Sequence, residues 1–304
     1  MYDVIMVNAI RLLTHVLPVQ TNPVTKYLVQ DQSLLSKFTM ISLTRFIQCV
    51  NKSANVRLQN SALIKNSKNP NRIWSQIVMK NKKDGSIMNV KVQTVPKDRF
   101  EDFIDLKMNH FVKDEITYKV SGINDNPEAV KECRAVLKNM MSQRAVHIHG
   151  YFREDEAEHS ELIGASSLIL ISKDDPLEEI TVKTKEMKRF FEIVRAWNLL
   201  YKYDEVFKRY GIDCFYQDAG LVIHPKYRLL GIAKYEALVR RLVCIAHGVP
   251  ATGAWCTMLG SQRASTLDDW DTLFEMSYDE LASRLGVQFN DPPPSCKYMA
   301  VKVL

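Results

Sequence analysis

The sequence has no long apolar run and no paired cysteines, and these two absences limit what the protein can be. No stretch of about 18 apolar residues occurs in the 304 residues, so we expect no membrane-spanning helix. The six cysteines stand singly, with no C-x-x-C spacing that could hold zinc or act as a redox pair. We therefore expect reduced thiols, no bound metal and a cytoplasmic protein.

Acidic residues are scarce in residues 1–72, which hold nine basic residues and two acidic ones; the rest of the chain is close to neutral. Apolar residues in this segment keep no steady helical or strand period. Three interpretations stay open: a poorly ordered extension, a mitochondrial presequence and a nucleic-acid-binding arm. The basic residues never cluster into a stripe, so no nucleic-acid partner is expected. A cleaved signal peptide is not expected either, because Asp3, Arg11 and His15 interrupt the first apolar run.

From Ile73 onward strand and helix signals alternate, which predicts one α/β domain over 73–304. The expected strands are 88–95, 145–152, 162–171, a segment through Leu221, Val222 and Ile223, 251–258 and 297–304. The expected helices begin at Pro96 and at Asn126-Pro127, cover 176–210 as one long stretch, and run over 231–247, with a short helix near Ser261.

Residues 220–233 run as a strand, a proline-marked exit, a tight turn and a helix. A helix N-terminus offers unpaired backbone N–H groups and a partial positive charge, so it binds phosphate without a dedicated side chain. Gly231 permits close approach of a ligand, and the small Ala233 leaves the first helical turn open. Arg228 and Lys226 add positive charge. The segment predicts a pyrophosphate site; the alternative is an ordinary strand-to-helix connection capped by glycine.

Arg228-x-x-Gly231-x-Ala233 resembles the pyrophosphate signature Q/R-x-x-G-x-G/A of the GNAT superfamily of N-acetyltransferases. Residues 111–115, F-V-K-D-E, resemble the F-x-x-D-E-P-L segment of insect arylalkylamine N-acetyltransferases. The stretches from Ser261 and from Met299 are similar to two further segments of that group, an S-x-x-x-A helix and a closing M-x-x-K-x-L strand. The resemblance covers residues 88–304.

This resemblance implies a GNAT fold, with a mixed sheet of about six to seven strands splayed at the fourth strand and flanked by helices. It implies transfer of an acetyl group from acetyl-CoA to a primary amine, such as a small aryl- or alkylamine. Backbone N–H groups of the splayed strand, with Val222 as the candidate, would stabilise the oxyanion of the tetrahedral intermediate. The acetyl-CoA contacts implied by the resemblance are Leu221, Val222, Ile223, Arg228, Leu229, Leu230, Gly231, Ile232, Ala233, Lys234 and Ser261.

By its position in the D-E segment, Glu115 is the candidate general base. A substrate ammonium with a pKa of about 10 must lose a proton before its nitrogen can attack, and a carboxylate can take that proton directly or through water. The alternative is that Asp114 and Glu115 are a solvated acidic pair that only attracts cationic amines. Both interpretations stay open.

The sequence also departs from the family pattern. Val222 and Lys226 stand where insect enzymes often carry serines, and Ile116 and Thr117 replace the proline and leucine after the glutamate. The tyrosine that many GNAT enzymes use as general acid has no clear counterpart near Asp268. A longer acyl-CoA, a protein amine as substrate, and CoA binding without catalysis therefore stay open as alternatives. The sequence does not indicate an oligomeric state.

Overall fold

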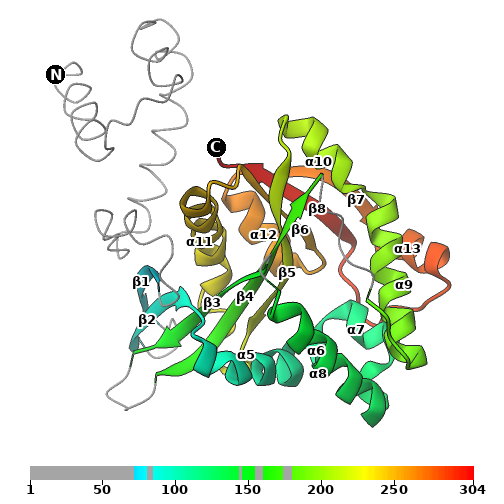
Figure 1. Ribbon diagram of the computed structural model, residues 1–304, viewed down its shortest axis with the longest axis horizontal. Helices are drawn as coiled ribbons and strands as arrows, with labels where there is room; N and C mark the ends of the chain where they lie inside the picture. The colour runs from blue at the N-terminus through cyan, green and yellow to red at the C-terminus, as the bar shows by residue number, and fades with distance from the viewer. Residues whose placement is uncertain (1–71, 81–84, 144–145, 155–159, 174–179) are drawn as a thin grey trace, which may run out of the picture. The chain divides into compact units, whose positions relative to one another are not determined.

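The computed structural model describes residues 72–80, 85–143, 146–154, 160–173 and 180–304. They form an eight-stranded mixed sheet in the order β1-β2-β3-β4-β5-β6-β8-β7 (Figure 1). The strands are β1 (Ile73–Lys80), β2 (Ile87–Thr94), β3 (Val146–Arg153), β4 (Glu161–Ser172), β5 (Cys214–Ile223), β6 (Ala251–Cys256), β7 (Asp271–Ser277) and β8 (Ser295–Lys302). The helices that matter below are α5 (Phe100–Leu106), α6 (Val112–Asp114), α7 (Ile116–Ser121), α8 (Pro127–Met141), α9 (Lys185–Leu200), α10 (Tyr203–Tyr210), α11 (Ile232–His247), α12 (Leu259–Leu267) and α13 (Tyr278–Leu285). The predicted mixed sheet flanked by helices is confirmed, with slightly more strands than expected.

Strand β1 is not among the strands expected from the sequence. It pairs antiparallel with β2, but its register shifts between Ile73 and Ser75. That irregularity breaks the simple alternation of inward and outward side chains, so the stretch carries a weak strand signal in sequence. Trp74 and Ile77 are nevertheless buried. Because β1 comes first, the strand predicted as the fourth is β5 in the numbering used here.

The prediction of one helix over 176–210 is wrong in extent. Helix α9 begins at Lys185, after Thr184 caps it by accepting a hydrogen bond from the Met187 N–H. It ends at Leu200, and α10 starts afresh at Tyr203. Tyr201 takes an extended conformation between them and stacks on Tyr298 of β8, with ring centroids 4.9 Å apart. A tertiary aromatic contact thus interrupts a continuous apolar pattern; residues 174–179 lie outside the described residues.

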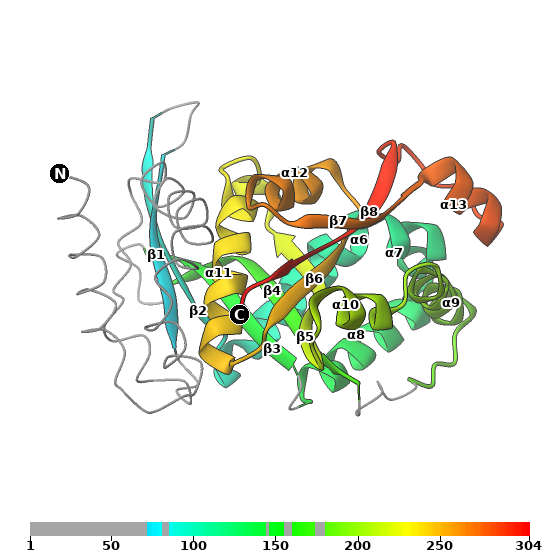
Figure 2. The same cartoon turned by 90° about the horizontal axis from the view of Figure 1, so that it is seen from above.

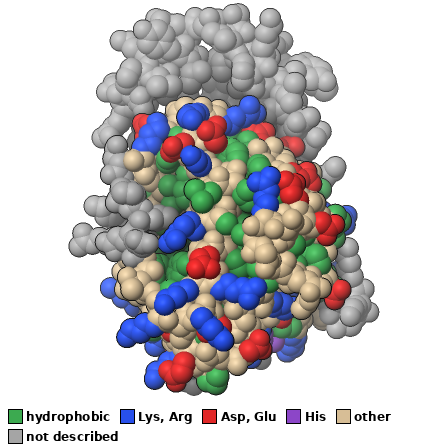
Figure 3. Space-filling view, turned by 90° about the vertical axis from the view of Figure 1, so that its right-hand side faces the viewer, with side chains coloured by type: hydrophobic (Ala, Val, Ile, Leu, Met, Phe, Trp, Pro, Cys, Tyr) green, Lys and Arg blue, Asp and Glu red, His purple; other side chains and the backbone are tan. Residues whose placement is uncertain are grey.

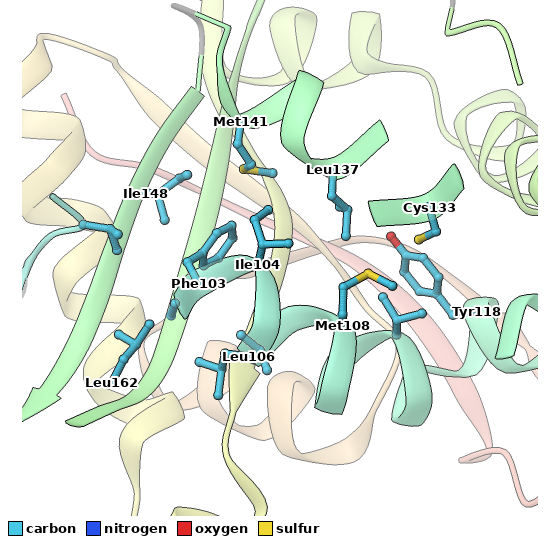
Figure 4. Close-up of a cluster of buried hydrophobic side chains, with 14 of the residues drawn as sticks. Phe103, Ile104, Leu106, Met108, Tyr118, Cys133, Leu137, Met141, Ile148 and Leu162 are labelled. Carbon is cyan, nitrogen blue, oxygen red and sulfur yellow. The ribbon is translucent and has the colours of Figure 1, made fainter. Parts of the chain in front are cut away.

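The two largest hydrophobic cores of the described residues lie on opposite faces of the sheet. On one face α5 and α8 pack on β3 and β4 (Figure 4). On the other face α11 packs on β1 to β5 through a second core, and Figure 2 shows α11 and α8 on opposite sides of the strands. Residues of the first core include Phe103, Ile104, Leu137, Met141, Ile148 and Leu162. The sheet is therefore a middle layer, and groups on its two faces reach a strand from opposite sides.

The remaining predictions concern the N-terminal segment, membrane-spanning helices and the cysteines. Residues 1–71 lie outside the described residues, so the basic extension and its boundary at 72 stay predictions. No helix in the described part of the chain is both long and apolar enough to cross a membrane. Lys and Arg side chains are scattered with acidic and hydrophobic ones over the side that carries α9 and α13 (Figure 3). The described cysteines, Cys133, Cys214, Cys244, Cys256 and Cys296, are free thiols.

Candidate active site

Strands β5 and β6 run parallel and then part. They pair only at Tyr216 with Thr252 and at Gln217 with Gly253. Beyond that point β5 continues to Ile223 with β4 on its other side, while β6 continues along β8. The edge of β5 that faces β6 is therefore left open over its last residues, which places the predicted splay at this strand.

The directions of the backbone amides at the opened edge follow from the pairing with β4. His224 donates its N–H to Ile163 O at 2.9 Å. Because N–H directions alternate along an antiparallel strand, Val222 also faces β4, where it lies opposite Ala165. The N–H groups of Leu221 and Ile223 point the other way, toward the gap between β5 and β6. This alternation argues against Val222 as oxyanion donor and favours its two neighbours.

A bulge in β5 directly precedes the open edge. Ser166 is opposite Leu221 and Leu168 is opposite Asp218, so the register shifts between them. Gly220 sits in the bulge with φ +110°, a left-handed conformation that favours glycine. A Cβ there would lie 2.7 Å from the ring of Phe111, so a side chain has no room. The bulge thus requires glycine for both its backbone angle and its packing.

Lys107 holds the bulge from the α5 side, and no sequence signal pointed to it. It starts a π-helical turn, Lys107–Phe111, and is 1% exposed. Its ammonium donates to Ser167 Oγ at 2.9 Å and to Ala219 O at 2.5 Å. Burial lowers the pKa of Lys107 to about 8, while the nearby Asp218 acts in the opposite direction. A π-helical turn is a recurrent mark of functional sites, and here it brings an amine to the strand that parts.

Replacing Lys107 with methionine should change how stability depends on pH. The lysine titrates near 10.5 in the unfolded chain and near 8 in the folded one, so between these values the unfolded chain holds the extra proton. The wild type therefore gains stability relative to K107M as the pH rises through this window, by up to about 3 kcal/mol. Urea unfolding of both proteins at several pH values measures this gain. A difference that stays constant from pH 7 to pH 10 would contradict it.

The turn after β5 ends in a helix start with open amides. Gly231 takes φ +93° and is the N-cap of α11, which begins at Ile232 and is 16 residues long. Within the described residues, the backbone N–H groups from Leu229 to Ala233 donate no hydrogen bond, and no side chain caps the helix. Nothing lies within 4 Å of the position that a Cβ on Gly231 would occupy. These amides and the helix dipole together form a site that suits a diphosphate.

Leu229 adds to the unusual character of this turn. It is a non-glycine residue with φ +65°, and its side chain is 98% exposed. Lys234 in the first turn of α11 is also exposed, whereas Ile232 is buried and anchors the helix start. The turn therefore presents its backbone and one lysine outward, while Ile232 fixes it to the core.

Arg228 does not point freely outward as its place in the signature suggests. Its Nε donates to Ile223 O at 3.0 Å, and its Nη2 lies 2.6 Å from Asp114 Oδ2. Both partners in this ion pair are substantially exposed, so the pair itself contributes little to stability. Arg228 instead ties the end of β5 to the segment that carries Glu115.

Glu115 lies between α6 and α7 and is the N-cap of α7. Its Oε2 accepts hydrogen bonds from the N–H groups of Thr117 at 2.8 Å and Tyr118 at 3.2 Å. Burial raises the pKa of Glu115, and these hydrogen bonds oppose the rise. Asp114 is exposed and faces Arg228, whereas Glu115 turns inward. The two carboxylates therefore do not form one solvated acidic pair.

Tyr278 lies near Glu115 and, like Lys107, was not identified from the sequence. Its hydroxyl donates to Thr257 O at 2.9 Å, just after the end of β6. The Thr257 side chain in turn hydrogen-bonds to Glu115. Burial raises the pKa of Tyr278, and the charge of Glu115 adds to the rise. Glu115, Thr257 and Tyr278 thus connect α7 to the strand across the gap from β5.

The helix predicted near Ser261 is α12, which follows β6. The Ser261 hydroxyl donates to Met258 O at 2.8 Å, so it is engaged within the first turn of its own helix. At the other end Asp268 accepts hydrogen bonds from Arg241 at 2.7 Å and from the Trp270 indole at 3.0 Å. Those contacts are structural, and they supply no acid in place of the missing tyrosine.

Solved structures that resemble this one include insect N-acetyltransferases. An Aedes aegypti protein assigned as arylalkylamine N-acetyltransferase 7 is 26% identical with a TM-score of 0.66, and the match covers 77% of this chain and 96% of that one. The chain has the GNAT fold. It resembles the insect arylalkylamine N-acetyltransferases within that superfamily. No protein-family model and no curated protein sequence matches the chain.

Two further GNAT structures share the fold alone. Arylalkylamine N-acetyltransferase 2 of Aedes aegypti is 16% identical with a TM-score of 0.55, and the match covers 71% of this chain and 99% of that one. A Drosophila melanogaster polyamine N-acetyltransferase is 10% identical with a TM-score of 0.50, with 70% and 99% covered. In this fold Arg228 connects the end of β5 to Asp114 through Ile223 O, and the Thr257 side chain after β6 hydrogen-bonds to Glu115.

Proposed function

We propose that this protein transfers an acetyl group from acetyl-CoA to a primary amine, and that the amine is a small aryl- or alkylamine. The observation that carries the proposal is the start of α11, where the N–H groups from Leu229 to Ala233 have no partner within the described residues. A diphosphate satisfies such donors, and the open edge of β5 lies directly before them in the chain.

The residues around this start would hold acetyl-CoA. Leu229, Leu230, Gly231, Ile232 and Ala233 offer their amides to the diphosphate, while Lys234 adds positive charge from the exposed face of the first turn. Arg228 holds the turn in place through Ile223 and Asp114. Ser261 lies in the first turn of α12, the helix that follows the opposite strand of the gap.

At the gap between β5 and β6, the open edge of β5 would contact the pantetheine arm of acetyl-CoA that carries the acetyl group. Leu221 and Ile223 direct their amides away from β4, so they can pair with the amide groups of an extended ligand. The same two N–H groups are the candidates for stabilising negative charge on the carbonyl oxygen. Acetyl-CoA itself supplies the activated acetyl thioester.

Glu115 is the group that would accept the proton of the amine. Glu115 is half-buried, and desolvation raises the pKa of its carboxyl above the usual value, which favours uptake of a proton. The choice of a small amine rests on the resemblance to a protein assigned as an arylalkylamine N-acetyltransferase. A longer acyl-CoA, a protein amine and CoA binding without turnover are outcomes that the experiment separates.

The test has two parts on the full chain. Acetyl-CoA and free CoA should each raise the melting temperature, because a ligand that binds only the folded state stabilises it. Pantetheine, which lacks the diphosphate, should have little effect. Thiol release from acetyl-CoA should then depend on added aryl- or alkylamines. A rise in melting temperature with no thiol release for any amine indicates binding without catalysis. The absence of any shift with CoA species rejects the proposal.

A further inference from the structure

The two strand edges that face each other across the gap would be expected to pair. Unpaired strand edges carry rows of N–H and C=O groups that favour closing on any neighbouring strand. Past Gln217 and Gly253, the last residues that pair, β5 continues through its bulge to Ile223 and β6 continues to Cys256. A gap between two such strands requires groups that hold it open.

Arg240 of α11 binds both strands at the point where they part. On β6 its Nη2 donates to Thr252 Oγ1 at 2.6 Å and to Gly253 O at 2.8 Å, and its Nε donates to Thr252 Oγ1 at 3.1 Å. On β5 its Nη1 lies 3.0 Å from Asp218 Oδ1. The Thr252 hydroxyl in turn donates a hydrogen bond to Tyr216 O of β5 at 3.0 Å. The planar guanidinium thus occupies the place at which further ladder hydrogen bonds would begin.

Asp218 links this contact to the bulge that follows. Its second oxygen accepts the N–H of Gly220 at 3.0 Å, so the carboxylate is held at one end by Arg240 and at the other by the bulged backbone. Lys107 holds the neighbouring Ala219 carbonyl from the opposite face. The gap and the bulge are therefore set by one connected group of charged side chains.

A tyrosine closes the same point from the other face of the sheet. The Tyr298 hydroxyl donates to Gln217 Oε1 at 2.7 Å, which connects β8 to β5 across β6. It crosses at Gly253, where a Cβ would lie 2.5 Å from that hydroxyl. The last pair of the β5–β6 ladder is thus fixed on both faces, and the parting is a defined feature of the fold.

The Arg240–Asp218 ion pair contributes little net stability, which indicates that its role is to fix the positions of the strands. Arg240 is 4% exposed, and removing two charges from water costs about as much as their attraction returns. The residue also stands nine positions after Gly231 on the same helix, a rise of about 13 Å. One rigid helix therefore presents open amides at its first turn and a strand spacer farther along.

We propose that Arg240 is a positioning residue for acetyl-CoA, which holds β5 and β6 apart so that the edge of Leu221 to Ile223 stays free for the acyl arm. The inference rests on the proposed function. Helix α11 also fixes the distance between the diphosphate site and the gap, because Gly231 is the N-cap of this helix and Arg240 lies within it.

The experiment compares three variants with the wild type. R240M/D218N removes the ion pair without leaving one buried charge alone. R240K keeps the positive charge but loses the fork that reaches both strands. R241M is the control on the same helix, because Arg241 is the next residue of α11 and its ion pair is with Asp268, which belongs to neither β5 nor β6. Each protein is measured for its melting temperature, its Kd for acetyl-CoA, and its KM values for acetyl-CoA and for the amine.

R240M/D218N should raise the Kd and KM for acetyl-CoA about tenfold or more, with the KM for the amine little changed and a melting temperature within a few degrees of the wild type. R240K should fail to restore acetyl-CoA affinity, whereas R241M should retain it. Wild-type acetyl-CoA affinity in R240M/D218N overturns the inference, and if that variant does not fold, wild-type affinity in R240K overturns it instead. If the wild type itself does not bind acetyl-CoA, the proposed function fails rather than the role of Arg240 alone.

Discussion

Replacing Ala233 with glutamate should weaken acetyl-CoA binding on the order of 100-fold while leaving the fold intact or slightly more stable. A carboxylate in the first turn of α11 interacts favourably with the helix dipole, so the helix start is stabilised. The same carboxylate repels a diphosphate that must approach the amides from Leu229 to Ala233, and about 100-fold corresponds to about 3 kcal/mol. Isothermal titration calorimetry with acetyl-CoA and a thermal melt measure the two effects separately.

Ile245→Glu is the control for this charge change. Ile245 is an exposed residue in the last turn of the same helix, so the substitution adds the same charge far from the open amides. It should leave the Kd for acetyl-CoA within about twofold, and the dipole should make the helix slightly less stable. Equal losses of affinity in both variants would show that net charge, and not the helix start, governs binding.

Replacing Glu115 with glutamine should lower kcat on the order of 100-fold or more, with the Kd for acetyl-CoA unchanged. Glutamine is nearly isosteric and its side-chain oxygen can still accept from the N–H groups of Thr117 and Tyr118, so the cap of α7 is kept. It cannot accept the proton of an ammonium, and general base catalysis contributes about 10²- to 10⁴-fold. Steady-state kinetics with the best amine of the panel measures the loss.

The pH dependence and a second variant separate the base from the cap. A base works only when ionised, so the wild-type kcat/KM should fall as the pH drops through the pKa of Glu115, which burial has raised, and the glutamine variant should lose this acidic limb. Glu115→Ala removes the cap as well and should cost about 1 kcal/mol of stability. Wild-type turnover in the glutamine variant would assign Glu115 a capping role only.

The start of α11 could be read from the sequence because its signals are local. A proline-marked exit from a strand, a glycine and an amphipathic helix follow one another within residues 220–247, and each signal acts on its own neighbourhood. The same holds for the cap at Asn126. Local turn and capping signals of this kind predict where a helix or strand begins without knowledge of the segments it packs against.

The rest of the site depends on contacts between distant segments. Lys107 meets Ser167 and Ala219 only because α5 packs across the sheet, and Arg240 meets Asp218 only because β5 and β6 are neighbours. In sequence, Arg240 is one of two consecutive arginines on an amphipathic helix, and nothing local distinguishes it from the next. Such pairings are set by topology, which the sequence indicates only as a fold class.

Leu229 shows where this fold tolerates an unfavourable backbone. An L-residue with a positive φ costs on the order of 1 kcal/mol, and its almost fully exposed side chain gains little burial in return. The conformation is thus imposed by the residues on either side, from the strand exit at Pro225 to the buried anchor at Ile232. Under the proposed function, this helix entrance already has its costly shape before acetyl-CoA arrives, so little ordering entropy would be lost on binding.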